Sequence, residues 1–167
     1  GGLSTGQVCV WDDPVTGAAV DVNKWTNSVV THTITQTAGV MLLNASSTLT
    51  VTTGAQQTSV AKFSVPMRGR AVWRRRVSLD AHQSGHIYET GFGNPTTSTT
   101  PSPGDGAFIR KTAAGQWEGR VASGSVEFGI NLITDSALVT AIGVATNYII
   151  LEVELAVEVA TFRMLEH

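Results

Sequence analysis

The chain has 167 residues, of which 42% are hydrophobic and only 14% are charged, and its net charge is −2. This length and composition fit a single globular domain, and the charge excludes a strong overall attraction to nucleic acid or to anionic membranes. Cys9 is the single cysteine, which excludes a framework of internal disulfides, and no uncharged run is apolar enough to cross a bilayer.

Strand-forming segments follow one another along the chain, with turn-forming residues between them. Only residues 21–27 favour a short helical turn. Residues 96–104 are uncharged, of low complexity and rich in Thr, Ser and Pro, which predicts a surface loop. Short strands at this spacing are typical of a sandwich or barrel. The predicted strands are Val8–Trp11, Thr31–Thr37, Val40–Asn44, Thr48–Thr52, Ser59–Val65, Ala71–Leu79, Ile87–Phe92, Ala107–Lys111, Trp117–Val121, Ser125–Ile130 and Tyr148–Phe162.

The clearest pattern lies in residues 148–162. Apolar side chains occupy one parity and glutamates the other, which predicts a strand with one buried face and one solvated face. A strand of this length would span about 50 Å, so we expect a turn or bulge near Ala156. The apolar set is Ile149, Leu151, Val153, Leu155, Val157 and Val159, and the glutamates are Glu152, Glu154 and Glu158.

Three groups of motifs point to one family when they are taken together. The first group consists of Trp11-Asp12-Asp13-Pro14 followed by Val20-Asp21-Val22-Asn23-Lys24-Trp25. The second consists of Gly91-Phe92-Gly93 followed by Asp105-Gly106-Ala107-Phe108-Ile109-Arg110. The third consists of Tyr148-Ile-Ile-Leu-Glu-Val followed by Val159-Ala-Thr-Phe162. In this order they resemble the concanavalin-A-like (laminin-G-like) jelly-roll domains of tailed-bacteriophage structural proteins, from about Val8 to Phe162.

The resemblance implies an all-β fold, a jelly-roll sandwich of two antiparallel sheets that occupies residues 1–164. We interpret Leu165-Glu166-His167 as the remnant of a cloning tag. Domains of this family continue past the final Phe with an Asp-Gly turn and a further strand, so we expect either that the domain is truncated at its C-terminus or that its closing strand comes from elsewhere. A missing strand would leave an open sheet edge that invites pairing with another copy. The aromatic residues expected in or near the core are Trp25, Trp73, Phe63, Phe92, Phe108, Tyr148 and Phe162.

The sequence offers little for catalysis or metal binding. His82, His86 and Glu89 have the spacing of metal ligands, but the Gln-Ser-Gly between the histidines predicts a turn, so we interpret the three as polar turn residues. The Glu-x-Asp-x-Glu strand of laminarinase-type hydrolases and the Gly-x-Ser-x-Gly nucleophile motif are both absent. The acidic row of residues 152–158 is explained as the solvated side of a strand. We therefore expect no enzymatic activity, catalytic residue, metal site or cofactor.

Five of the eleven basic residues lie between Arg68 and Arg76. Alternation places Arg74 and Arg76 on one face of a strand and Arg75 on the apolar face, where burial would require a carboxylate partner. A patch for nucleic acid, acidic glycan or an acidic protein surface is one interpretation. We favour a subunit interface or ion pairs within the chain, and we expect no nucleic acid partner.

Carbohydrate binding is another hypothesis. A sugar site needs an exposed aromatic platform with polar groups beside it, sometimes organised by Ca²⁺. Asp12, Asp13, Asn94 and Asp105 supply such polar groups, and Trp117 is the candidate platform. The competing interpretation is that the Asp and Asn side chains hold turns and that the tryptophans fill the core.

We predict a non-enzymatic virion protein of a tailed phage, a capsid-decorating or tail-associated module assembled in the host cytoplasm. It would act by surface contact with other virion proteins or with copies of itself, since its low charge density reduces the cost of desolvation. A symmetric homo-oligomer is expected, and a membrane partner is not. The alternative is a lectin-like adhesion module that binds glycans of the host surface.

Overall fold

The computed structural model describes residues 18–37, 40–44, 54–59, 70–78, 85–94, 103–132, 148–156 and 158–166. Every regular element within these ranges is a β-strand, and all of the pairings between them are antiparallel. These residues include no helix that could span a membrane. The prediction of an all-β protein built from antiparallel sheets is therefore confirmed.

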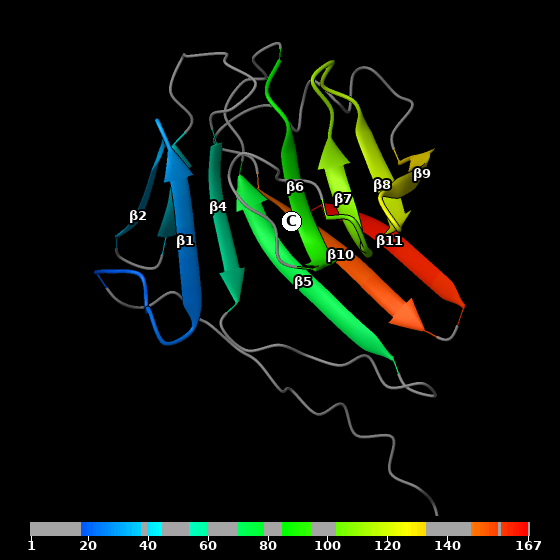
Figure 1. The fold of residues 1–167 in the computed structure, drawn as a ribbon, viewed down its shortest axis with the longest axis horizontal. Helices are drawn as coiled ribbons and strands as arrows, with labels where there is room; N and C mark the ends of the chain where they lie inside the picture. The colour runs from blue at the N-terminus through cyan, green and yellow to red at the C-terminus, as the bar shows by residue number, and fades with distance from the viewer. Residues whose placement is uncertain are drawn as a thin grey trace, which may run out of the picture.

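The described strands form four sheets (Figure 1). Two of the sheets are pairs: β1 (Trp25–Val30) with β4 (Gly54–Ser59), and β2 (Thr33–Thr37) with β3 (Val40–Asn44). The three-stranded sheet has the order β11 (Val159–Glu166), β10 (Tyr148–Ala156), β5 (Ala71–Ser78). The four-stranded sheet has the order β6 (Tyr88–Gly93), β7 (Gly106–Lys111), β8 (Trp117–Ser123), β9 (Val126–Asn131).

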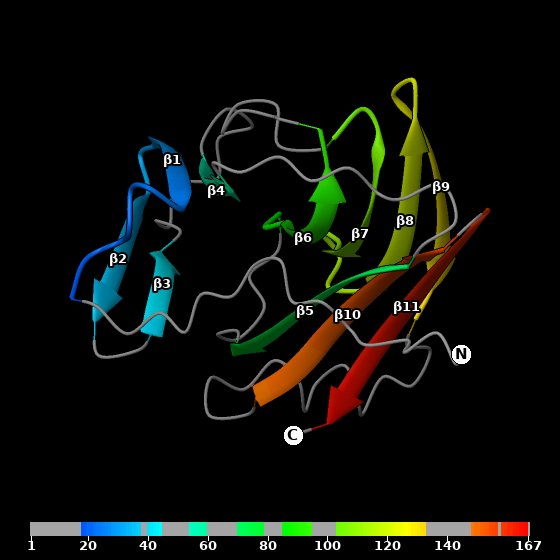
Figure 2. The same ribbon diagram turned by 90° about the horizontal axis from the view of Figure 1, so that it is seen from below.

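The hydrophobic core lies between the two larger sheets. Figure 2 shows β5, β10 and β11 crossing one face of the four-stranded sheet. Each fully buried large apolar side chain contributes about 1.5–3 kcal/mol relative to its exposed state, so this contact is the main source of stability in the described residues. The core consists of Ala107, Ile109 and Trp117 on one side and Ile149, Leu151 and Val153 on the other.

Three of the aromatic residues predicted in the core, Trp73, Phe92 and Phe162, do pack against it. Phe108 is also buried, but it alternates with Ala107 and Ile109 along β7 and therefore lies on the opposite face of the sheet. Trp117 is fully buried at the centre of the core, which agrees with the interpretation that the tryptophans fill the core.

Two aromatic positions differ from the prediction, and one is not described. Tyr148 is 41% exposed, so its placement in the core was wrong: it begins β10 on the parity that faces away from the four-stranded sheet. Trp25 is half-buried on β1, where the guanidinium of Arg75 lies 5.8 Å from its ring centroid. Phe63 lies outside the described residues.

The long C-terminal segment is a hairpin, which confirms the predicted break near Ala156. Strand β10 ends at Ala156, β11 begins at Val159, and these two residues pair across the turn. Glu158 adopts a φ of 62°, so the turn uses a left-handed residue without glycine or proline.

Strand boundaries near the N-terminus differ from the predicted ones. The carbonyl of Asp21 accepts hydrogen bonds from the amides of Lys24 and Trp25, which makes a single turn, but the chain then extends as β1 rather than continuing as helix to residue 27. Strand β4 begins at Gly54, in the interval between the predicted strands at 48–52 and 59–65. The predicted strands at 8–11 and 48–52, most of the one at 59–65, and most of the loop at 96–104 lie outside the described residues.

Candidate functional site

The outward face of the three-stranded sheet carries a charged ladder. The strand register sets Arg74 of β5 opposite Glu152 of β10, and Glu152 opposite Arg163 of β11. Side chains directly opposite one another on antiparallel strands lie about 4.5–5.5 Å apart at Cβ, which is close enough for ion pairs. Alternation along each strand therefore places these three charges on one face, away from the core.

Each glutamate of the ladder binds two arginines. Nε of Arg74 donates to Oε2 of Glu152 at 2.7 Å, and Nη1 of Arg163 donates to Oε1 of the same carboxylate at 2.5 Å. Arg163 Nη1 also donates to Oε2 of Glu154 at 2.9 Å, while Nε of Arg70 lies 2.8 Å from Oε1 of Glu154. One arginine thus bridges two glutamates, and the ladder connects all three strands.

The carboxylates of the ladder are more deeply buried than its guanidinium groups. The Glu152 side chain is 4% exposed, whereas that of Arg74 is 61% exposed, so the prediction of a solvated glutamate row is wrong at Glu152. Burial alone would raise the pKa of Glu152, but the hydrogen bonds from Arg74 and Arg163 outweigh it and hold the pKa below its usual value. The carboxylates of the ladder therefore lie beneath its more exposed arginines.

We call the set Arg70, Arg74, Arg76 and Arg163 the arginine face. The four guanidinium groups of this face are accompanied by two carboxylates, those of Glu152 and Glu154. Among its described residues the positive charges therefore exceed the negative ones by two. Arg76 lies over the ring of Tyr148, with its Cζ 4.1 Å from the ring centroid. The face therefore combines excess positive charge with an exposed aromatic ring.

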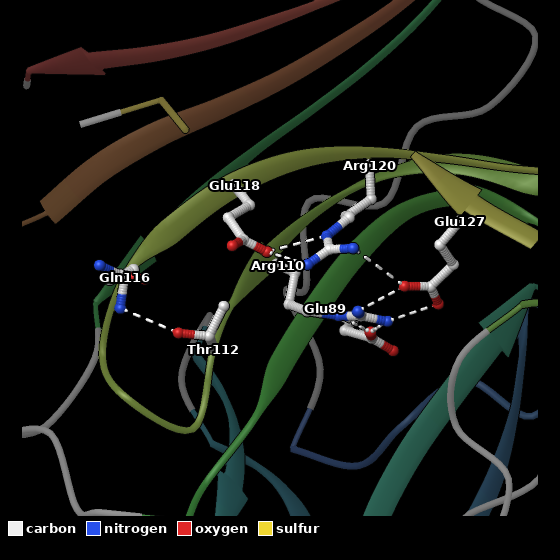
Figure 3. Close-up of polar contacts among 7 residues, drawn as sticks. All are labelled: Glu89, Arg110, Thr112, Gln116, Glu118, Arg120 and Glu127. Atoms are coloured by element: carbon white, nitrogen blue, oxygen red, sulfur yellow. Dashed lines mark hydrogen bonds and ion pairs between the residues drawn. The ribbon is translucent and has the colours of Figure 1, made fainter. Parts of the chain in front are cut away.

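A second charged network lies on the four-stranded sheet, on the face opposite the core (Figure 3). The register sets Glu89, Arg110 and Glu118 in one row across β6, β7 and β8. Arg110 donates from Nε to Oε1 of Glu89 at 2.5 Å, and from Nη1 and Nη2 to the two oxygens of Glu127 at 2.6 and 2.8 Å. Arg120 binds Oε2 of Glu118 through Nε at 2.8 Å and reaches Oε2 of Glu127 at 3.4 Å.

The pKa shifts in this network suit a structural role and not acid catalysis. The hydrogen bond from Arg110 is the largest effect on Glu127 and holds the pKa of its carboxyl below the usual value. A general acid needs a raised pKa, so that it carries a proton at neutral pH. Glu127 and Glu152 are shifted in the opposite direction, and both accept hydrogen bonds from arginine. These two glutamates are therefore suited to holding strands and arginines in place.

The residues proposed for sugar binding have other contacts. Asp105 Oδ1 accepts a hydrogen bond from the amide of Gly124 at 2.8 Å, and Asn94 Oδ1 accepts one from the amide of Asp105 at 3.3 Å. The structure thus brings Asn94 and Asp105 together, where they hold turns. Trp117 is fully buried, so its assignment as an exposed platform was wrong. Asp12 and Asp13 lie outside the described residues.

The predicted interface arginines lie on two different faces of β5, as the alternation of side chains along a strand requires. Arg74 and Arg76 are exposed on the arginine face, and Arg75 points to the other side of β5. The recorded contacts of the Arg75 guanidinium are the sulfur of Met41, 3.6 Å from Nη2, and the ring of Trp25. The carboxylate partner expected for Arg75 is not found among the described residues, because an aromatic face and a thioether take its place.

The metal hypothesis has little geometric basis in the described part of the chain. Glu89 is engaged by Arg110, and His82 lies outside the described residues. These residues contain no group of three His, Cys, Asp or Glu side chains that could hold a metal ion.

Sequence reasoning missed how the charges combine. The alternating glutamates of β10 and the three consecutive arginines of β5 were visible in the sequence, but the pairing of Glu152 with Arg74 depends on the register between segments 78 residues apart. Arg163 and Arg110 carried no distinguishing local signal.

Comparison with protein-family models, curated proteins and solved structures finds no match for this chain.

Proposed function

We propose that this chain is a non-enzymatic contact module that docks its arginine face onto an acidic surface of another protein. The observation that carries the proposal is the asymmetry of the ladder: exposed guanidinium groups outnumber the carboxylates that lie beneath them. A partner that presents Asp or Glu side chains would complete the charge balance.

The glutamates make the arginines better binding groups. A free arginine side chain loses rotamer freedom when it binds, which reduces affinity. Here Glu152 and Glu154 already hold Arg70, Arg74 and Arg163, so less freedom is lost on docking. A guanidinium group can bind carboxylates through two parallel hydrogen bonds, and arginine and tyrosine are both enriched in protein interfaces.

We place this module in the virion of a tailed phage, as a capsid-decorating or tail-associated protein that assembles in the host cytoplasm and folds as a jelly-roll sandwich. The motif resemblance over residues 8–162 supports this setting, and so does the packing of two antiparallel sheets around one core. Its partners would be other virion proteins or copies of itself.

The docking proposal can be tested by NMR titration with a glutamate-rich peptide, in parallel with single-stranded DNA, a heparin oligosaccharide and neutral glycans. We expect shifts at Arg74, Arg76 and Arg163 with the peptide that weaken as salt is added. Arg76→Glu should reduce binding at least tenfold. Arg75→Gln, which removes a charge from the opposite face of the same strand, should have little effect.

Absence of a peptide response at these residues would overturn the docking proposal, and stronger binding of DNA or glycan would replace it with another class of partner. To test the placement in a phage virion, the gene neighbourhood and purified particles can be examined. We expect the gene to lie among head or tail genes and antibodies against the chain to label the particles. A gene outside such a block, together with unlabelled particles, would contradict it.

A further inference from the structure

Strand β9 is an edge strand whose backbone groups can be assigned a direction. Gly124 and Ser125 have φ values of 56° and 66°, and Ser123 pairs with Val126 across this two-residue turn, as in a type I′ hairpin. The amide of Leu132 donates to the carbonyl of Trp117 at 2.9 Å. Both observations place the even-numbered residues of β9 in hydrogen-bonded pairs with β8.

The odd-numbered residues Glu127, Gly129 and Asn131 therefore direct their backbone N–H and C=O groups away from β8, because these directions alternate along an antiparallel strand. The described residues contain no strand that pairs with this side of β9. Edge strands are commonly protected by lysine, proline or a bulge, and the sequence of β9, Val-Glu-Phe-Gly-Ile-Asn, has neither lysine nor proline.

The same strand carries an uncovered apolar row. Val126, Phe128 and Ile130 are 57%, 68% and 60% exposed. They lie on the core-facing side of the sheet, since Ile130 pairs with Gly119 and a Cβ on Gly119 would meet the ring of Phe162 on β11. Strand β11 thus packs against β8, and the apolar surface continues past it onto β9.

We propose that β9 pairs in antiparallel orientation with β9 of a second copy of this chain, about a two-fold axis at Phe128. The two four-stranded sheets then become one sheet of eight strands. Val126 faces Ile130 of the second copy, Phe128 faces its counterpart, and Glu127 faces Gly129. This inference goes beyond the proposed function and does not use the arginine face, so either can fail without the other.

The edge of β9 is complementary to itself, which is why we propose a second copy of the chain as its partner. This register opposes each exposed apolar side chain of β9 to another one, on a single face. Glu127 meets a glycine, so no like charges oppose each other across the strands, and its own charge is already balanced by Arg110 and Arg120. A register centred on Gly129 would instead set Val126 against Leu132, which packs against the core.

The outward backbone groups agree with this register. Glu127 and Gly129 of the second copy would form a hydrogen-bonded pair, and the two Phe128 residues a non-hydrogen-bonded pair, in which side chains approach most closely. Such an isologous contact about a two-fold axis is the commonest form of symmetric association.

Disulfide trapping tests the register. In a Cys9→Ser background, we expect Phe128→Cys to form a covalent dimer under mild oxidation, because Cβ atoms at a non-hydrogen-bonded pair lie within disulfide range. Val126→Cys and Ile130→Cys should each give no covalent dimer, and the double variant with both cysteines should cross-link. Equal cross-linking by Val126→Cys alone, or none by Phe128→Cys, would overturn the register.

Sedimentation and hydrogen exchange test the contact without cysteines. We expect the wild-type protein to dimerise with rising concentration and Phe128→Lys to raise the dissociation constant at least tenfold. Val40→Lys, which alters an exposed valine of β3, should leave it unchanged. The Gly129 amide should become protected as the dimer forms. A wild-type protein that stays monomeric, or a dimer that tolerates Phe128→Lys, would overturn the proposal.

Discussion

Gly119 of β8 and Phe162 of β11 approach each other so closely across the core that a Cβ on Gly119 would lie 2.5 Å from Cδ2 of the ring. The aromatic ring occupies the space that a side chain at residue 119 would need. The contact between β8 and β11 at this point therefore depends on a glycine.

Gly119→Ala should destabilise the protein by about 1–3 kcal/mol, because the ring would have to move within a packed core. Phe162→Leu in the same chain should recover part of this loss, and urea unfolding would measure both effects. Gly104→Ala is the control: its Cβ would lie 3.1 Å from Oγ of Ser125, away from the core, so it should cost much less. Strictly additive effects of the substitutions at 119 and 162 would contradict this account.

Glu152→Gln should lower the free energy of unfolding by about 1–3 kcal/mol, because the buried partner of two arginines loses its charge while Arg74 and Arg163 keep theirs. Chemical denaturation would measure the change. Glu158→Gln, in the exposed β10–β11 turn, should alter stability by less than about 0.5 kcal/mol. Equal effects of the two substitutions would show that the ladder does not stabilise the sheet.

The pH dependence follows from the lowered pKa values of Glu127 and Glu152. A carboxyl whose pKa is lower in the folded state contributes stability that is complete above its unfolded pKa and is lost as the pH falls through the folded value. We therefore expect stability to decline below about pH 4.5, the ordinary value for glutamate. Thermal unfolding between pH 2 and 7 would show this decline, and Glu152→Gln should make it shallower. An unchanged slope would contradict it.

Lys111→Met should stabilise the protein by about 1 kcal/mol at neutral pH. Lys111 is buried beside Trp117, burial lowers its pKa, and the described residues include no ion-pair partner for it. Its charged form is therefore disfavoured in the folded state. Lys111→Arg, which keeps the charge, should give no gain in melting temperature. A loss of stability with methionine would show that the ammonium group has a favourable role.

The local patterns in the sequence predicted much of the fold. Alternation identified β10 and β11, and the length of the segment required the turn at Ala156. The segment that became β1 was misjudged because Asp21 begins a single turn that resembles a helix start, and only the partner strand β4 decides its extended conformation. Propensity cannot supply that information, since strand formation depends on the neighbouring strands.

The site was harder to predict for the same reason. Glu152 looks like a solvated residue in sequence because its neighbours Leu151 and Val153 are buried. It is bound by arginines on two other strands, and the positions of these arginines depend on register. Nothing local in the sequence showed that Trp117 is buried; its pairing with Lys111 sets it on the face of the sheet that carries Ala107 and Ile109.

The pairing of β5 with β10 also has a consequence for synthesis. Arg74 and Glu152 are 78 residues apart in the chain, so β5 cannot form this pairing until the segment through Ala156 has left the ribosome. Such distant pairings are slow to form and leave strands exposed while they wait. During translation β5 would therefore carry three adjacent arginines before the carboxylate partners that β10 supplies have been made.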